Sequence, residues 1–216
     1  MSRRYLLISE HASPLAALGG TDAGGQNVYV AQVARRLAEA GHHVDVATRR
    51  DDPDAPMICR PAPGLRVIHV PAGPPERVRK EDLLPYMGEF TDFVERRMFG
   101  GRGGYDLVHA NFFMSGLAAA ELKVRTGVPF VVTFHALGRV RRLHQGEADA
   151  FPDERLDVEE RVVAEADRVI AECPQDEADL VDLYGADPSR LATVPCGFDP
   201  AEFRPGDRRR ARERLG

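Results

Sequence analysis

The chain of 216 residues is poor in cysteine. Its three cysteines, Cys59, Cys173 and Cys196, lie far apart and form no CxxC pair or Cys/His spacing of the kind that holds structural zinc. A small, odd number of cysteines is also typical of a reducing compartment, where disulfides do not persist. We therefore expect no bound metal and no disulfide framework, and we expect the protein to be cytoplasmic.

Long apolar runs and a basic surplus are missing as well. The amino-terminal sequence MSRRYLLISEH holds only four consecutive apolar residues, too few for a signal peptide or a membrane span, and these fit a first buried strand. The chain has 29 basic and 34 acidic residues and a net charge of −5. Nucleic-acid-binding domains carry a basic excess on one face, so we expect no nucleic-acid partner. The sequence leaves contact with a membrane surface open.

Several catalytic and nucleotide-binding patterns are absent. No Ser/His/Asp or Cys/His nucleophile arrangement occurs, and the chain has neither GxGxxG nor GK[ST], which disfavours a dinucleotide fingerprint and a Walker loop. Glu10 and Asp22 are a candidate carboxylate pair, but their spacing does not fix a geometry.

Short β-rich apolar runs alternate with longer amphipathic stretches. Strands are expected at 5–9, 43–48, 66–70, 107–110, 130–133, 169–171 and 191–194. Helices are expected at 27–40, 81–99, 115–126, 158–166 and 177–184. This alternation predicts an α/β domain with a Rossmann-like parallel sheet and helices on both faces. Residues 53–63 are expected to be a proline-rich linker, and residues 146–153 a mobile loop.

A glycine-rich segment, GGTDAGGQN at 19–27, joins the first strand to the first helix. A helix amino terminus at the carboxyl edge of a parallel sheet offers free N–H groups to an anion. Glycine has no Cβ, so the backbone at Gly24 and Gly25 can approach a diphosphate closely. The same glycines also suit a flexible loop that only makes turns, and the loop alone does not separate the two interpretations.

Polar residues follow three of the expected strands, at Glu10, Asn111 and His135. The carboxyl ends of parallel strands share one edge, so these side chains should converge on a cleft. A neutral imidazole at His135 could bond a sugar hydroxyl or a carbonyl, whereas His109, inside a strand, is expected to be structural. Lys80, Arg139, Arg141, Arg142 and Arg155 are candidate phosphate ligands, each with a solvated surface cation as an equal alternative.

The tail differs in composition from the rest of the chain. Prolines and glycines cluster after Val194, and a charged stretch at 206–216 has helical character. We expect residues 1–196 to form one domain and residues 197–216 to form a linker and the start of a second domain.

Five segments, in this order along the chain, resemble the amino-terminal domain of the retaining GT-B glycosyltransferases of family 4. They are GGTDAGGQNVYV at 19–30, DLVHANFFMSG at 106–116, TFHALG at 133–138, EADRVIA at 165–171 and VPCGFDPAEFRP at 194–205. This group includes the sucrose-phosphate synthases and the glycosyltransferase of the mycothiol pathway.

The resemblance implies the amino-terminal half of a GT-B fold, with a second, carboxyl-terminal domain that grips a nucleoside diphosphate sugar as co-substrate, without a bound cofactor. It implies transfer to a sugar or sugar-phosphate-like acceptor with retained configuration, and an isolated half that is inactive. Gly24 and Gly25 match the donor diphosphate loop, and His135 matches the catalytic-site histidine beside the donor sugar. Contacts to the acceptor or donor sugar are implied for Gln26, Asn27, Asn111 and Phe112.

Three cations align with basic acceptor contacts of these enzymes: Lys80, Arg141 and Arg155. The chain departs from the family at Asn111, where a second histidine is common, at Phe112, where tyrosine is usual, and at Ala136, where serine or threonine is usual. The acceptor is therefore expected to be a different sugar, or a phosphate held differently.

Two other functions stay open. One is a stand-alone nucleotide- or sugar-binding module without chemistry, against which the linker-like tail argues. The other is half of a sugar-nucleotide epimerase, which needs acidic and histidine pairs for proton abstraction. A shared architecture does not decide between these enzymes.

Overall fold

The computed structural model describes residues 1–16, 24–100, 104–201 and 203–216. Its sheet has the strand order β3-β4-β2-β1-β5-β6-β7-β8, and every pair is parallel except β3 with β4. The strands are β1 (Arg4–Ile8), β2 (His43–Arg49), β3 (Ile58–Ala62), β4 (Leu65–Val70), β5 (Leu107–Asn111), β6 (Phe130–Thr133), β7 (Arg168–Ala171) and β8 (Leu191–Thr193). The expected α/β architecture is confirmed.

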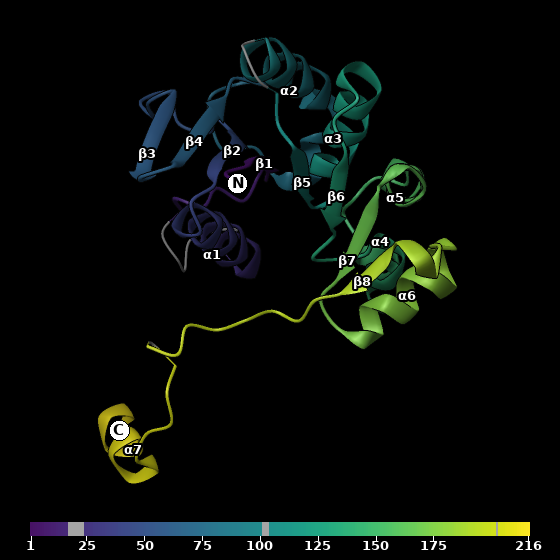
Figure 1. Cartoon of the computed structure of the whole chain (residues 1–216). Helices are drawn as coiled ribbons and strands as arrows, with labels where there is room; N and C mark the ends of the chain where they lie inside the picture. The colour runs from purple at the N-terminus through teal and green to yellow at the C-terminus, as the bar shows by residue number, and fades with distance from the viewer. Residues whose placement is uncertain (17–23, 101–103, 202) are drawn as a thin grey trace.

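Helices cover both faces of the sheet: α1 lies on one face, and α2, α3 and α5 pack together on the other (Figure 1). The α-helices are α1 (Gly25–Glu39), α2 (Met87–Val94), α3 (Phe113–Thr126), α4 (Gly138–Gln145), α5 (Glu154–Glu165), α6 (Pro174–Tyr184) and α7 (Arg208–Leu215). Short 3-10 or π turns occur at η1 (Lys80–Asp82), η2 (Leu84–Tyr86), η3 (Glu95–Phe99), η4 (Gly146–Ala148) and η5 (Pro188–Arg190).

The two faces of β1 belong to two separate apolar cores. Leu6 and Ile8 pack into the larger core under α2 and α3, and Leu7 packs into the smaller core with Val30 and Ala34 of α1. Side chains alternate between the faces of a strand, so a strand buried on both sides needs an uninterrupted apolar run. Each of these three β1 side chains is at most 1% exposed, and burying one contributes about 1.5–3 kcal/mol.

The order in which the chain adds strands to the sheet reverses at β1. β1 lies between β2 and β5, so the chain winds one way through β2 and β4 and the other way through β5 to β8. Ligands of open α/β sheets bind outside the carboxyl ends of the strands at such a reversal. The topology therefore places a cleft beside the ends of β1 and β5.

Two sequence predictions were wrong in this half of the chain. Residues 53–63 were expected to be a linker, yet they contain β3, an antiparallel edge strand joined to β4 through Gly64 at φ +77°. An edge strand tolerates Pro61, because one row of its N–H groups has no partner strand. The helix expected at 81–99 is also broken: Pro85 lies in a 3-10 turn, and α2 begins only at Met87.

The segment around residue 146 also differs from expectation. Residues 138–145 form α4, which the sequence did not signal because the helix is only eight residues long and Val140 and Leu143 are its only large apolar side chains. The expected mobile loop at 146–153 begins with a 3-10 turn and is anchored to the body. Phe151 is buried, and the buried Asp149 carboxylate accepts a hydrogen bond from Arg141.

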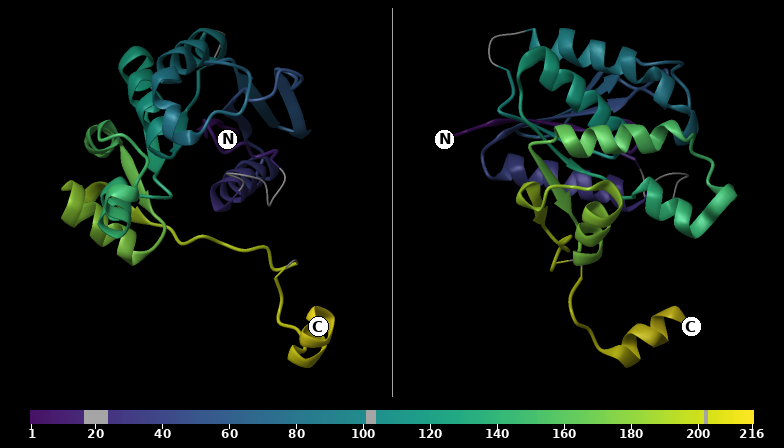
Figure 2. Two further views of the ribbon diagram at one scale, coloured as in Figure 1. Left: turned by 180° about the vertical axis from the view of Figure 1, so that it is seen from behind. Right: turned by 90° about the vertical axis from the view of Figure 1, so that its right-hand side faces the viewer.

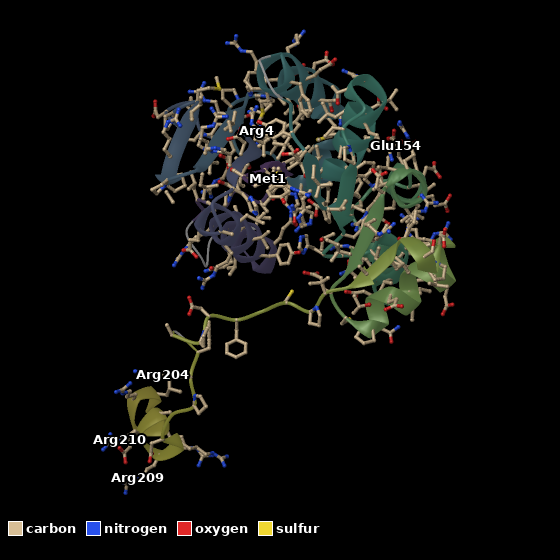
Figure 3. All side chains as sticks on the ribbon, in the orientation of Figure 1. Met1, Arg4, Glu154, Arg204, Arg209 and Arg210 are labelled. Atoms are coloured by element: carbon tan, nitrogen blue, oxygen red, sulfur yellow. The ribbon has the colours of Figure 1, made fainter. Side chains whose placement is uncertain are left out.

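An extended segment follows β8 and leads to α7, which lies apart from the sheet in all views (Figures 1 and 2). Arg204, Arg209 and Arg210 project from this tail into open space (Figure 3). Phe198 and Phe203 are 72% and 66% exposed. In the described part of the chain, no helix is both long and apolar enough to cross a bilayer.

Candidate ligand-binding cleft

A cavity of about 610 Å³ opens at the carboxyl edge of the sheet. It lies at the ends of β1, β5, β6 and β7, beside the amino terminus of α1, where the reversal of strand order predicts a cleft. Of the site residues predicted from the sequence, the following line it: Gly24, Gly25, Gln26, Asn27, Lys80, Phe112, His135, Arg141 and Arg155. Asn111, another of the predicted site residues, lies behind the wall and accepts a hydrogen bond from His135.

The amino terminus of α1 is open toward the cavity. A Cβ added at Gly24 or Gly25 would meet no atom of the described residues within 4 Å, so packing against this part of the chain does not demand glycine at either position. The bare backbone instead leaves the first N–H groups of the helix accessible to an anion. Residues 17–23 of the glycine-rich loop lie outside the described part of the chain, and Asp22, the expected partner of Glu10, is among them.

Gln26 and Asn27 hold this helix end against the sheet. The Gln26 side-chain amide donates to Ser9 Oγ and to the Asn111 carbonyl, both at 3.2 Å. Asn27 accepts from the Gly24 N–H at 3.0 Å and donates to the Ser13 carbonyl at 2.9 Å. The two side chains thus fix the position of the helix terminus relative to β1 and β5.

His135 is constrained through both its backbone and its ring. Its backbone is left-handed, with φ +59°, and Phe112 at the neighbouring strand end has φ +87°. Non-glycine residues in this region are strained and persist only where their surroundings enforce it. The ring lies between Asn111 and Glu172, with Tyr29 in edge contact at 4.8 Å between ring centroids.

Two neighbours of His135, the His109 ring and the Glu172 carboxyl, have lowered pKa values. Burial, helped by the nearby His135, lowers the pKa of His109 to about 4, and the His109 ring bonds Thr133 Oγ1 at 2.9 Å. The hydrogen bond from His135 lowers the pKa of the Glu172 carboxyl. At neutral pH His109 is therefore neutral and Glu172 is ionised.

Arg155 lies under the cleft floor between three aromatic rings. Its guanidinium carbon is 4.4 Å from the centroid of Phe151, 4.9 Å from that of Phe113 and 5.1 Å from that of Phe112. Nε pairs with Glu159 Oε1 at 2.7 Å, and Nη2 donates to the Ala136 carbonyl at 2.8 Å. Nη1 is buried and has no hydrogen-bond partner among the described residues, which is uncommon for a buried polar atom.

Only one of the three arginines of α4 lines the cavity. Arg141 does so while it pairs with Asp149 at 2.8 Å. Arg139 pairs with Glu160, and Arg142 pairs with Asp153 at 2.6 Å. Lys80, from η1, completes the cationic wall together with Arg141 and Arg155.

Sequence reasoning missed several lining residues: Tyr29, Phe151, Glu172 and Cys196. Glu172 directly follows β7, so the same strand-end argument that identified His135 could have found it. His11 is held by Glu10, whose buried carboxylate lies 2.7 Å from His11 Nδ1 and also accepts from the Ser115 hydroxyl. Among the described residues, no group of three or more His, Cys, Asp and Glu side chains could hold a metal ion.

The sequence matches known proteins along its whole length. A family model described as a glycosyl transferase 4-like domain matches residues 24–197. D-inositol 3-phosphate glycosyltransferase 2 of Catenulispora acidiphila is 44% identical, over 100% of this chain and 51% of that protein. A D-inositol 3-phosphate glycosyltransferase of Acidothermus cellulolyticus is 45% identical, over 99% of this chain and 48% of that protein. The chain thus spans about half the length of these curated relatives.

Solved structures show the same arrangement. Sucrose-phosphate synthase of Thermosynechococcus elongatus has a TM-score of 0.90 and 33% identity, with 99% of this chain and 53% of that chain covered. The Anabaena protein HepE, 14% identical with a TM-score of 0.58, shares the fold, over 99% of this chain and 50% of its own. The resemblance inferred from the five sequence segments is confirmed.

Proposed function

The chain belongs to the glycosyl transferase 4-like family, and from this premise we propose that it is the acceptor-side half of a retaining glycosyltransferase. Its domain is of the GT-B type. The observation that carries the proposal is the cleft, which brings an open helix amino terminus, His135 and three cations into one cavity of about 610 Å³. The donor is a nucleoside diphosphate sugar, used as a co-substrate rather than as a bound cofactor.

The open end of α1 supports the proposed donor side. The N–H groups beside Gly24 and Gly25 and the positive end of the helix dipole would face the donor diphosphate. Negative charge accumulates on that group as the glycosidic bond to it breaks. Donors fixed in place before the reaction stabilise such charge without reorganisation.

The cationic wall supports the proposed acceptor side. Arg155 Nη1 has no protein partner among the described residues and belongs to a side chain of the cavity wall. The relatives are named for D-inositol 3-phosphate, and the solved neighbour is named a sucrose-phosphate synthase. We propose a sugar or sugar-phosphate-like acceptor. Phe112 and Ala136 offer no hydroxyl group, so its anchoring would depend on Arg155 and Lys80.

The extended tail and the lengths of the relatives support a second domain. We propose residues 1–196 as the acceptor-side domain and residues 197–216 as the linker and the beginning of a donor-binding domain. The relatives are about twice as long as this chain. The chain by itself would be inactive because the residues that grip the donor belong to the other half. Its sparse cysteines support a cytoplasmic location.

A chimera tests the proposal. Residues 1–196 are joined to the carboxyl-terminal half of the Catenulispora relative, and the chimera is incubated with a panel of nucleoside diphosphate sugars and D-inositol 3-phosphate. We expect a product whose anomeric configuration, measured by NMR, equals that of the donor, and no product from either half alone.

The rival functions give different outcomes. A folded chimera that epimerises the sugar nucleotide and leaves the acceptor untouched would support an epimerase. A chimera that binds ligands but transfers nothing, while the intact relative is active in the same assay, would contradict the proposal.

A further inference from the structure

Three neighbouring strands end in a connected row of polar side chains. β5, β6 and β7 lead to Asn111, His135 and Glu172. His135 Nε2 lies 3.1 Å from Asn111 Oδ1, and His135 Nδ1 lies 3.2 Å from a Glu172 carboxylate oxygen. Both ring nitrogens therefore face protein oxygens across the cleft wall.

The orientation of the Asn111 amide is fixed independently of His135. Its Nδ2 donates to the Ile8 carbonyl at 3.3 Å and to the His109 carbonyl at 3.2 Å. A carbonyl only accepts, so the nitrogen end of the amide must face these two groups and the oxygen end must face His135. His135 Nε2 must then carry a proton and donate it.

The other ring nitrogen has an equally defined role. An ionised carboxylate only accepts hydrogen bonds, so His135 Nδ1 must also donate toward Glu172. We propose that Glu172 is a positioning residue that holds the His135 imidazole doubly protonated, with both ring N–H groups committed to protein acceptors. The neutral ring would direct a lone pair at either the Asn111 oxygen or the carboxylate.

The other titratable groups that face His135 and Glu172 are uncharged at neutral pH. His109 of β5 is neutral above about pH 4 because burial lowers its pKa. Burial raises the pKa of the Tyr29 phenol on α1. Cys196, from the tail, donates its thiol proton to Glu172 at 3.1 Å, and burial raises its pKa to about 11. Among these neighbours, Glu172 carries the one negative charge.

The inference restricts what His135 can do in the reaction. A ring with both N–H groups committed has no lone pair with which to take a proton from an acceptor hydroxyl. This consequence for catalysis rests on the proposed function. The protonation state of the His135 ring does not depend on that function. His135 would contribute charge and a fixed ring, and general base catalysis would fall to another group.

The ¹⁵N resonances of the imidazole test the proposal on the 216-residue chain. At pH 7.5 an unperturbed histidine, with a pKa of about 6.5, is mostly neutral. We expect the two ring nitrogens of His135, assigned by comparison with His135→Gln, to show the shifts of a doubly protonated ring. In Glu172→Gln we expect a neutral ring with its proton on Nε2, because the glutamine amide can donate to Nδ1.

A matched variant controls for the substitution itself. Glu177→Gln makes the same change on α6, where the carboxylate accepts from the Thr193 hydroxyl outside the cleft lining, and it should leave the His135 resonances unchanged. A neutral His135 in the wild type, or a doubly protonated ring in folded Glu172→Gln, would overturn the proposal. The wild-type spectrum decides even if Glu172→Gln does not fold.

Discussion

Arg155 and Glu159 form an ion pair that is buried on both sides, with Nε and Oε1 2.7 Å apart and side-chain exposures of 1% and 0%. The Glu159 carboxylate also accepts from the Gly138 N–H at 2.9 Å and from the Tyr184 hydroxyl. One carboxylate thus joins the start of α4, the first turns of α5 and the end of α6. The same contacts hold the Arg155 guanidinium under the cleft.

Removing the charge of Glu159 should destabilise the fold strongly. Glu159→Gln leaves the Arg155 cation buried without a counter-ion, which costs about 3–5 kcal/mol in the free energy of unfolding. Urea denaturation followed by circular dichroism measures this loss of stability. Glu39→Gln, which weakens the exposed pairs with Arg35 and Arg36 on α1, is the control and should cause little change. A loss below about 1 kcal/mol in Glu159→Gln would contradict the buried-pair account.

Because of His109, the free energy of unfolding should decrease as the pH falls below about 6.5. The folded state keeps this histidine neutral down to about pH 4, whereas its ordinary pKa is 6.5. The unfolded state therefore binds the extra proton first, and stability is full above pH 6.5 and falls as the pH drops toward 4. The pKa difference corresponds to about 3 kcal/mol.

Urea midpoints at pH 7.5, 5.5 and 4.5 check this contribution. His109→Gln should lower stability at pH 7.5 and lose less between pH 7.5 and 4.5 than the wild type does. His144→Gln removes an exposed histidine of α4 and should keep the wild-type acid dependence. Equal acid dependence in His109→Gln and the wild type would refute the assignment.

Gly116 sets the distance between α3 and α5. A Cβ at this position would lie 2.6 Å from Val162 Cγ1, and the β-branched valine has little rotamer freedom to move away. Gly116→Ala should therefore destabilise the fold by about 1–3 kcal/mol, and adding Val162→Ala should recover part of the loss.

A second glycine provides the control for helix propensity. At Gly88 in α2, a Cβ would meet no atom within 4 Å in the part of the chain that the structure describes. Gly88→Ala should stabilise by about 0.5–1 kcal/mol. If both alanine variants stabilise to the same extent in thermal unfolding, close packing at Gly116 is not what limits the side chain there.

The sequence predicted the parallel sheet well because strands buried on both faces leave uninterrupted apolar runs, as at Leu6, Leu7 and Ile8. β3 escaped notice because an exposed edge strand carries no such run and holds Pro61. Most of the cleft was also predictable, because the ends of parallel strands share one edge. Asn111 and His135 followed from that rule alone.

The pairing of the site residues was beyond sequence reasoning. Arg155 and Glu159 are four residues apart on a helix, a spacing that is usual on solvent-exposed faces, and only the fold shows this pair to be buried. Cys196 comes from the tail, and its contact with Glu172 joins positions 24 residues apart. Such contacts depend on how α5, β7 and the tail pack.

The most direct test of the acceptor-side assignment is calorimetric titration of the 216-residue chain with D-inositol 3-phosphate, inositol and UDP. Arg155→Lys keeps a cation for Glu159 but loses the planar guanidinium and its Nη1 donor, and Arg139→Gln is the control because Arg139 pairs with Glu160 outside the cavity lining. We predict that the wild-type chain binds the sugar phosphate and does not bind UDP. Binding of the sugar phosphate should weaken by about tenfold in Arg155→Lys, in line with the loss of a charge-assisted hydrogen bond. It should be unchanged in Arg139→Gln. Tight UDP binding without any response to the sugar phosphate would contradict the acceptor-side assignment.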